Sequence, residues 1–209
     1  MGEDLWDAYD RMGLSFQQHA VDSAANAHYD RPAVLAALGP VMGRQVLDAA
    51  CGPGLYLREL MERGAEVTAF DASPVMVALA RQRTADRVRI DQAALGEPLP
   101  YPDGAFDLIV CALAIHYASD RAAAFAEFCR VLRPGGAAVV STQHPLLRAP
   151  SRPRDPAIMP TESAASPAGK LPITTITSGE ISGCMTEVSS HRLTRCAEGV
   201  ARPAFLLPE

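Results

Sequence analysis

Short apolar runs alternate with amphipathic segments between residues 45 and 142, and this alternation constrains the fold more than any other feature of the sequence. Runs typical of buried strands span residues 45–50, 65–70, 106–111 and 137–142, and residues 87–90 (RVRI) indicate a further short strand. Helical spacing of apolar residues recurs at 55–63, 74–80 and 120–132. Because parallel strands need long crossovers, which are almost always right-handed, the pattern predicts an α/β fold: a doubly wound, mostly parallel sheet with helices on both faces.

The rest of the 209-residue chain carries weaker patterns. Residues 1–40 show helical spacing and are expected to form an N-terminal helical lid segment ahead of a core at 41–145. Residues 146–209 are rich in proline, and no Phe, Tyr or Trp occurs between Cys129 and Ala204. We expect 146–179 to be an exposed, poorly ordered linker. The same domain would then end in weak elements: a strand at 186–191, a short helix at 193–201 and a strand stub at 205–207.

Charge and composition argue against several classes of function. Nineteen basic against 24 acidic residues give a net charge of -5, and no basic cluster resembles a nucleic-acid-binding surface. The longest apolar run, 108–115, is far shorter than the roughly 20 residues of a membrane span. The acidic first ten residues are unlike a signal peptide, so we expect a cytoplasmic protein. The five cysteines form no C-x-x-C pair, and we expect neither disulfides nor a metal site.

The turn after the first strand carries the clearest functional signal. Ligands of open α/β sheets bind beyond the carboxyl ends of the strands, and there Gly52 and Gly54 let the backbone approach a ligand closely. Asp71 ends the next strand, 17 positions after Gly54, where its carboxylate can accept hydrogen bonds from both hydroxyls of a ribose. Together these features predict an adenosine site, whereas each alone also fits a structural turn or a helix cap.

Two residues narrow the class of ligand. Leu57 stands where the third glycine of a G-x-G-x-x-G fingerprint would fall, which argues against a dinucleotide and so against a nucleotide-dependent oxidoreductase. Asp48, just before the turn, would repel a diphosphate and attract an ammonium group. A ligand with a ribose, a carboxylate and an ammonium group fits this turn better, and S-adenosylmethionine carries all three.

Five ordered segments have distinctive sequences: 46–54 (VLDAACGPG), 70–74 (FDASP), 98–107 (PLPYPDGAFD), 116–117 (HY) and 130–136 (RVLRPGG). They resemble the successive motifs of class I S-adenosylmethionine-dependent methyltransferases. The similarity is greatest to the small-molecule enzymes of ubiquinone and menaquinone biosynthesis (the type 11 methyltransferase domain), and with 26–32 it covers about residues 26 to 145. The resemblance implies a Rossmann-like fold, S-adenosylmethionine as cofactor and methyl transfer to a small-molecule acceptor.

The resemblance also implies which residues surround the cofactor. Its methionine and ribose parts would be held by Asp48, the backbone of Ala50, Cys51, Gly52 and Gly54, and Asp71. Ala72 and Met76 would border the adenine, Ala94 and Leu95 would lie along its edge, and Cys111 and Ala112 would form the floor beneath the sulfonium.

Two positions depart from the family's pattern. Ala50 stands where the family often has its first glycine, and Ala94 stands where it usually has an aspartate that accepts the adenine amino group. Loss of one charge-assisted hydrogen bond costs about 1.5 to 3 kcal/mol. We therefore predict weaker cofactor binding than is typical of the family, unless Asp91 compensates through a shift of its loop.

Methyl transfer from a sulfonium is an in-line displacement that orientation alone can promote. If the acceptor is a hydroxyl, a base is needed, and His116, just past the fourth strand, is the candidate catalytic residue. His144, after the fifth strand, is a second candidate, and both also fit a packing role. The segment expected to supply the acceptor pocket lacks aromatic residues, so a cofactor-binding but catalytically impaired relative is the alternative.

Overall fold

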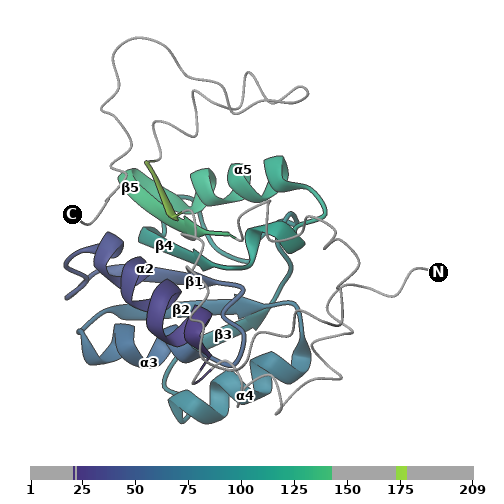
Figure 1. Cartoon of the computed structure of the whole chain (residues 1–209). Coiled ribbons are helices and arrows are strands. Elements are labelled where there is room, and N and C mark those ends of the chain that lie inside the picture. Colours follow the sequence, from purple (N-terminus) through teal and green to yellow (C-terminus); the bar gives the residue numbers. More distant parts are fainter. Residues whose placement is uncertain (1–20, 22, 143–172, 178–209) are drawn as a thin grey trace, which may run out of the picture.

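The computed structural model describes residues 21, 23–142 and 173–177, which form a six-stranded sheet with helices packed against it (Figure 1). The strands are β1 (Gln45–Ala49), β2 (Glu66–Asp71), β3 (Arg89–Gln92), β4 (Phe106–Ala112), β5 (Leu132–Ser141) and β6 (Ile173–Thr177). Their order is β3-β2-β1-β4-β5-β6; β1 to β5 are parallel, and β6 runs antiparallel to β5. The predicted doubly wound α/β fold is confirmed.

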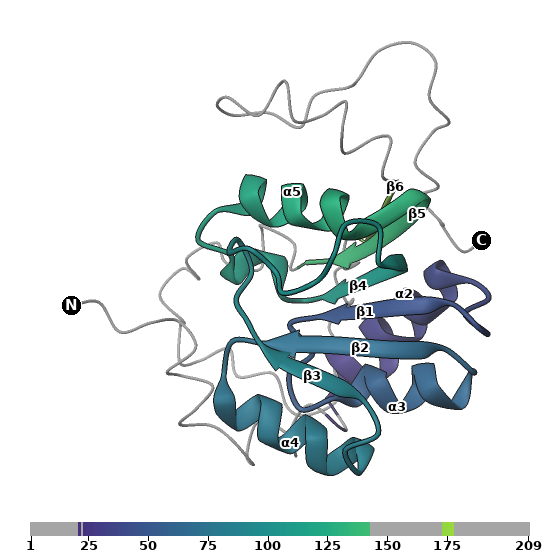
Figure 2. The same cartoon turned by 180° about the vertical axis from the view of Figure 1, so that it is seen from behind.

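Helices cover both faces of the sheet. They are η1 (Ala24–Asp30), α2 (Arg31–Leu38), α3 (Leu55–Glu62), α4 (Pro74–Thr84), η2 (Ile115–Tyr117) and α5 (Arg121–Val131). Helices α2 and α3 lie in front of the strands in Figure 1 and behind them in Figure 2, and α4 packs beside α3. Helix α5 packs on the opposite face. In the part of the chain that the structure describes, no helix is long and apolar enough to cross a membrane.

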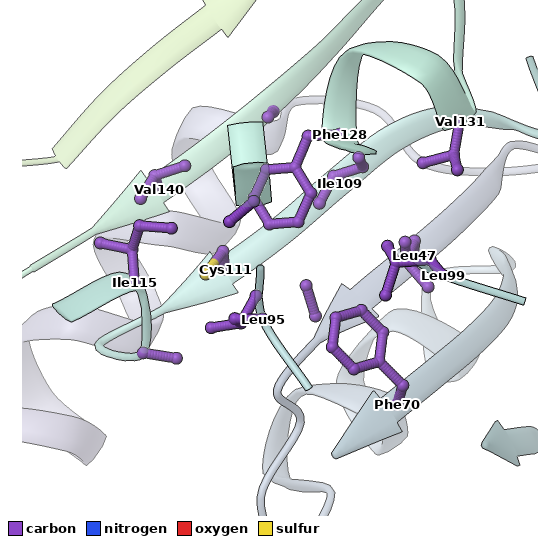
Figure 3. Packing of buried hydrophobic residues seen from close by; sticks show 14 of the residues in the cluster. Leu47, Phe70, Leu95, Leu99, Ile109, Cys111, Ile115, Phe128, Val131 and Val140 are labelled. Carbon is purple, nitrogen blue, oxygen red and sulfur yellow. The ribbon is translucent and has the colours of Figure 1, made fainter. Parts of the chain in front are cut away.

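Alternate residues of the central strands point to opposite faces of the sheet. Val110 packs with α2 and α3, whereas Ile109 packs against Phe128 of α5 on the other face (Figure 3). Asp48 of β1 is the register partner of Val110 and therefore shares the α2 and α3 face. Cys111 follows Val110 in the strand, so its side chain lies on the α5 face. The side chains of Asp48 and Cys111, which were both predicted to surround the cofactor, therefore lie on opposite faces of the sheet.

The amino-terminal edge of the sheet is held by residues from the motif-like segments. Arg130 donates to the backbone oxygens of Leu99 (3.0 Å) and Tyr101 (2.7 Å) and so fixes the loop before β4 against α5. Asp107 Oδ2 accepts a hydrogen bond from the backbone nitrogen of Gln45, which opens β1, at 2.8 Å. These motif residues stabilise the fold at the edge opposite to the one where ligands bind.

Three local expectations need correction. Strand β3 begins two residues later than the predicted run 87–90, because the backbone nitrogen of Arg87 donates to Thr84 and closes the turn after α4. Strand β5 begins at Leu132, five residues before the predicted run 137–142, so residues 133–136 lie within it, opposite a register shift at the start of β4. The expectation of a linker throughout 146–179 is wrong where β6 forms. The elements predicted at 186–191, 193–201 and 205–207, and most of the predicted lid at 1–40, lie outside the described residues.

Candidate functional site

The turn after β1 is built from residues in left-handed backbone conformations, with φ of +58° at Ala50, +53° at Gly52 and +79° at Gly54. Asp71, at the end of β2, braces this turn: its Oδ2 accepts from the nitrogen of Gly52 at 2.7 Å, and its Oδ1 accepts from that of Ser73 at 3.0 Å. A carboxylate can accept about four hydrogen bonds, so these two do not exhaust its capacity. The structure therefore brings the predicted glycine turn and the predicted ribose-binding acid into direct contact.

The two glycines of the turn have different surroundings. A Cβ atom at Gly54 would lie 3.1 Å from both the Cα and the Cβ of Ala80, so this glycine lets α4 pack against the start of α3. A Cβ atom at Gly52 would meet nothing within 4 Å. Gly54 is thus required by helix packing, whereas the space beside Gly52 lets a ligand approach the backbone.

Asp48 is the most isolated polar group of the site. Its side chain is 1% exposed, and Oδ2 has no hydrogen-bond partner among the described residues. Burial, and then the negative charge of Asp71, raise the pKa of Asp48 to about 8. Burial and the same two carboxylates raise the pKa of the Cys51 thiol well above its usual value. A buried carboxyl oxygen without a partner is costly, and a bound ammonium group would supply a donor for Oδ2 and a compensating positive charge.

Four predicted adenine-contacting residues lie near the carboxyl ends of β2 and β3: Ala72, Met76, Ala94 and Leu95. The backbone nitrogen of Ala93 donates to the oxygen of Asp71 at 3.1 Å and ties the loop after β3 to β2. Asp91 remains within β3 and forms an ion pair with Arg89 at 2.9 Å. It therefore does not replace the acid that is missing at Ala94.

The two predicted floor residues lie on opposite sides of the sheet. Cys111 is fully buried beneath α5, where Figure 3 shows it among Leu95, Ile115 and Val140. Burial raises the pKa of its thiol, with a smaller contribution from Asp48. Ala112, at the end of β4, is half-buried and packs against the cluster that α2 forms with Val46 and Val110. The structure thus places Ala112, but not the side chain of Cys111, on the face that carries Asp48.

His116 lies in η2, just beyond the carboxyl end of β4. Its Nδ1 is 3.5 Å from Oγ1 of Thr142, the residue after β5, and its ring centroid is 4.2 Å from that of Tyr117. The half-buried imidazole is therefore at the predicted edge of the sheet, whereas His144 lies outside the described residues. Within residues 23–142 and 173–177, no cluster of His, Cys, Asp and Glu is placed to hold a metal ion.

Sequence reasoning did not identify one pair of polar residues near this edge. The hydroxyl of Tyr56 donates to Oδ2 of Asp30 at 2.7 Å. Asp30 is 1% exposed, and its Oδ1 has no hydrogen-bond partner in the described part of the chain. Burial raises the pKa of Asp30, against the lowering effects of Ser141, Tyr56 and Arg31. In the sequence, Asp30 before Arg31-Pro32 reads only as a helix cap, yet the structure shows no cap hydrogen bond from its side chain.

The order of the parallel strands, the glycine turn after β1 and the acid at the end of β2 together define a Rossmann-like nucleoside-binding domain. Residues 47–140 match a family model described as a methyltransferase domain. A malonyl-[acyl-carrier protein] O-methyltransferase of Serratia marcescens is 45% identical over 102 residues, which are 48% of this chain and 38% of the relative. A demethylmenaquinone methyltransferase of Tropheryma whipplei is 36% identical over 135 residues, 64% of this chain and 53% of the relative.

Solved structures agree with these relatives. The crystal structure of an S-adenosylmethionine-dependent methyltransferase from Mesorhizobium loti shares 39% sequence identity, with a TM-score of 0.54 over 58% of this chain and 56% of the other. For residues 47–140, the family model, the relatives and the solved structure together support a class I S-adenosylmethionine-dependent methyltransferase domain, and they do not favour the oxidoreductase alternative. The chain spans 38% and 53% of the lengths of the two curated relatives.

Proposed function

We propose that this chain binds S-adenosylmethionine across the carboxyl ends of β1 and β2 and transfers its methyl group to a small-molecule acceptor. The observation that carries the proposal is Asp48, a buried carboxyl whose Oδ2 lacks a partner among the described residues, at the start of a turn with open space beside Gly52. A ligand with an ammonium group near its nucleoside satisfies this arrangement.

Each part of the cofactor has a set of residues suited to it. Asp48 binds the ammonium group, the backbone of Ala50, Cys51, Gly52 and Gly54 approaches the methionine carboxylate, and Asp71 accepts hydrogen bonds from the ribose hydroxyls. Ala72, Met76, Ala94 and Leu95 border the adenine, and Ala112 lies beneath the sulfonium. The side chains of Cys111 and Leu95 both pack in the cluster under α5, so these two residues would face the cofactor through their backbone.

When bound, S-adenosylmethionine supplies a methyl group on a positively charged sulfur. The chain's contribution is to hold the acceptor atom about 3 Å from the methyl carbon, in line with the bond that breaks. If the acceptor is a hydroxyl, its proton must be removed. Two side chains near the carboxyl edge are candidates to receive it: His116, and Asp30 through its unbonded Oδ1.

The names of the relatives suggest which acceptors to test. One acts on a malonyl group carried by an acyl-carrier protein and another on demethylmenaquinone. A malonyl thioester and a reduced demethylmenaquinone analogue therefore sample two different acceptor chemistries in a methyl-transfer assay with labelled cofactor. Transfer to either acceptor would support the proposed activity and assign the acceptor class.

A second candidate function is cofactor binding without methyl transfer. The relatives, which are named as methyltransferases, do not favour it, and the missing acid at Ala94 bears on cofactor affinity in both cases. Binding of S-adenosylhomocysteine together with no transfer across the acceptor panel would favour this candidate over the enzyme.

Cofactor binding is tested by calorimetric titration with S-adenosylmethionine, S-adenosylhomocysteine and NADH. We expect the first two to bind and NADH not to bind. Replacing Asp71 with alanine removes the acceptor for the ribose and the brace on Gly52, so the Asp71→Ala variant should lose about tenfold or more in affinity for S-adenosylhomocysteine.

The matched control is Glu97→Ala, which removes an exposed carboxylate from the loop after β3 and should leave the affinity unchanged. Circular dichroism shows whether each variant is folded. Near-native affinity in the Asp71→Ala variant would refute the ribose assignment, and absence of binding by the folded wild-type chain would refute the proposed function.

A further inference from the structure

The carboxyl end of β3 lies where the adenine of the proposed cofactor would be recognised, yet the loop that follows offers little to recognise it with. Residues 92–95 are Gln-Ala-Ala-Leu, so Gln92 is the only polar side chain among them. Ala94 and Leu95 are both buried and apolar. Because apolar contacts alone discriminate poorly between purines with different polar groups, adenine recognition needs hydrogen-bonding groups here, and Gln92 carries the one polar side chain among residues 92–95.

Gln92 is placed and oriented by the sheet. It is the last residue of β3, and it pairs in register with Asp71 of β2. Its Nε2 donates to the backbone oxygen of Ala72 at 3.3 Å. Since a carbonyl oxygen only accepts hydrogen bonds, the amide nitrogen faces Ala72 and the amide oxygen Oε1 faces away from it. The side chain is exposed, and within the described residues Oε1 has no hydrogen-bond partner.

The neighbouring acid does not compete for this role. Asp91 pairs in register with Phe70 and is bound to Arg89 at 2.9 Å. Because successive strand residues point to opposite faces, the side chain of Asp91 leaves β3 on the other side from that of Gln92. Of the polar side chains that end β3, Gln92 is therefore the one directed to the backbone that follows Asp71.

We propose that Gln92 is the residue that reads the adenine, an inference that rests on the proposed function. Its Oε1 accepts a hydrogen bond from the 6-amino group of the adenine. The second hydrogen of Nε2 is donated to ring nitrogen N7. This bidentate pairing of an amide with adenine is the same geometry by which glutamine side chains recognise adenine in DNA. Gln92 thus performs, from two positions earlier, the task of the acid that is absent at Ala94.

The test compares S-adenosylhomocysteine with S-inosylhomocysteine, in which an oxygen replaces the 6-amino group. The wild-type chain should bind the adenine ligand about tenfold or more tightly than the inosine ligand, because the oxygen of the latter repels Oε1. In Gln92→Ala and in the near-isosteric Gln92→Leu, affinity for the adenine ligand should fall about tenfold, and the preference should fall to within about twofold. The control is Gln82→Ala, which replaces an exposed glutamine on α4. It should retain both the affinity for the adenine ligand and the preference over the inosine ligand.

A double-mutant cycle sharpens the assignment. Ala94→Asp restores the missing acid, so it should recover adenine preference in the Gln92→Ala background and add little to the wild-type chain. The inference would be overturned if the folded Gln92 variants kept the adenine preference of the wild-type chain. It would also be overturned if the wild-type chain bound the adenine and inosine ligands equally well. If the folded wild-type chain binds neither ligand, the proposed function itself fails, which is a different result.

Discussion

At the scale of single residues, the buried carboxyl of Asp48 shows how a site can be recognised from its energetic cost. Native proteins rarely keep a buried carboxyl oxygen without a hydrogen-bond partner, and such exceptions concentrate at functional sites. Asp48 combines this feature with burial and with the nearby charge of Asp71, which together raise its pKa to about 8. The folded chain without ligand therefore favours the protonated form, whereas an ammonium ligand favours the charged form.

This pKa shift gives a pH dependence of known sign. Because the folded-state pKa of Asp48 lies above its usual value of 3.8, deprotonation opposes folding, and stability falls as the pH rises from about 4 to about 8. The contribution of Asp48 to this slope is at most about 1.4 kcal/mol per pH unit. The Asp48→Asn variant should lose this slope and be more stable than the wild-type chain above pH 7.

Urea unfolding of both proteins between pH 5 and pH 8 measures the difference in slope. Groups whose shifted pKa values do not depend on Asp48, such as Asp30, contribute equally to both proteins and cancel in the comparison. Parallel stability curves for the two proteins would contradict the assignment of the slope to Asp48.

At the scale of elements, the β1–α3 turn shows that two glycines of one motif serve different purposes. Gly54 has φ of +79° and lies against Ala80, so it determines how closely α3 and α4 approach. Gly52 has φ of +53° and open space beside it. The sequence assigns both glycines to ligand approach, and only the position of α4 in the folded chain distinguishes them.

Alanine substitution separates the two roles. Gly54→Ala combines backbone strain with a contact at 3.1 Å to Ala80, so it should lower the free energy of unfolding by about 2 to 4 kcal/mol. Gly52→Ala meets no neighbour and should cost only the strain of about 1 to 2 kcal/mol. Its larger effect should be a loss of S-adenosylhomocysteine affinity of about tenfold, because the new methyl group occupies the proposed ligand space.

Urea unfolding and calorimetric titration of both variants provide the two measurements. The glycine assignments would be reversed if Gly54→Ala remained as stable as the wild-type chain while Gly52→Ala unfolded more readily.

At the scale of the whole molecule, the sequence predicted what local patterns determine and missed what depends on distant contacts. The central parallel strands β1 and β4 were predictable because they are apolar runs buried on both faces, whereas β3, with exposed Arg89 and Gln92, shows the weakest pattern. The Asp30–Tyr56 hydrogen bond was not predictable, because it joins residues 26 positions apart that carry no shared motif. The side chains of Asp48 and Cys111 lie on opposite faces of the sheet because Asp48 pairs in register with Val110, the residue before Cys111. The register between two strands cannot be read from the sequence of either motif alone.

Strand β6 is the clearest case of a nonlocal element. Its sequence, Ile-Thr-Thr-Ile-Thr, has β-branched residues throughout but lies in a proline-rich region, so composition predicted a linker. The folded chain pairs all five of these residues with Ala137–Ser141 of β5. The antiparallel partner is what makes this segment a strand, since it covers an edge that β5 would otherwise expose.

Removing β6 should therefore affect both stability and association. A chain ending at Thr142 leaves the apolar edge of β5 unpaired and should lose about 1 kcal/mol of unfolding free energy for each backbone hydrogen bond that is lost. The open edge should also promote pairing between molecules, seen as concentration-dependent association in sedimentation velocity. A chain ending at Ser178 keeps β6 and is the matched control. If the two truncated chains are equally stable and equally monomeric, then β6 contributes nothing to the sheet, and the position of the sheet's edge must be reassigned to β5.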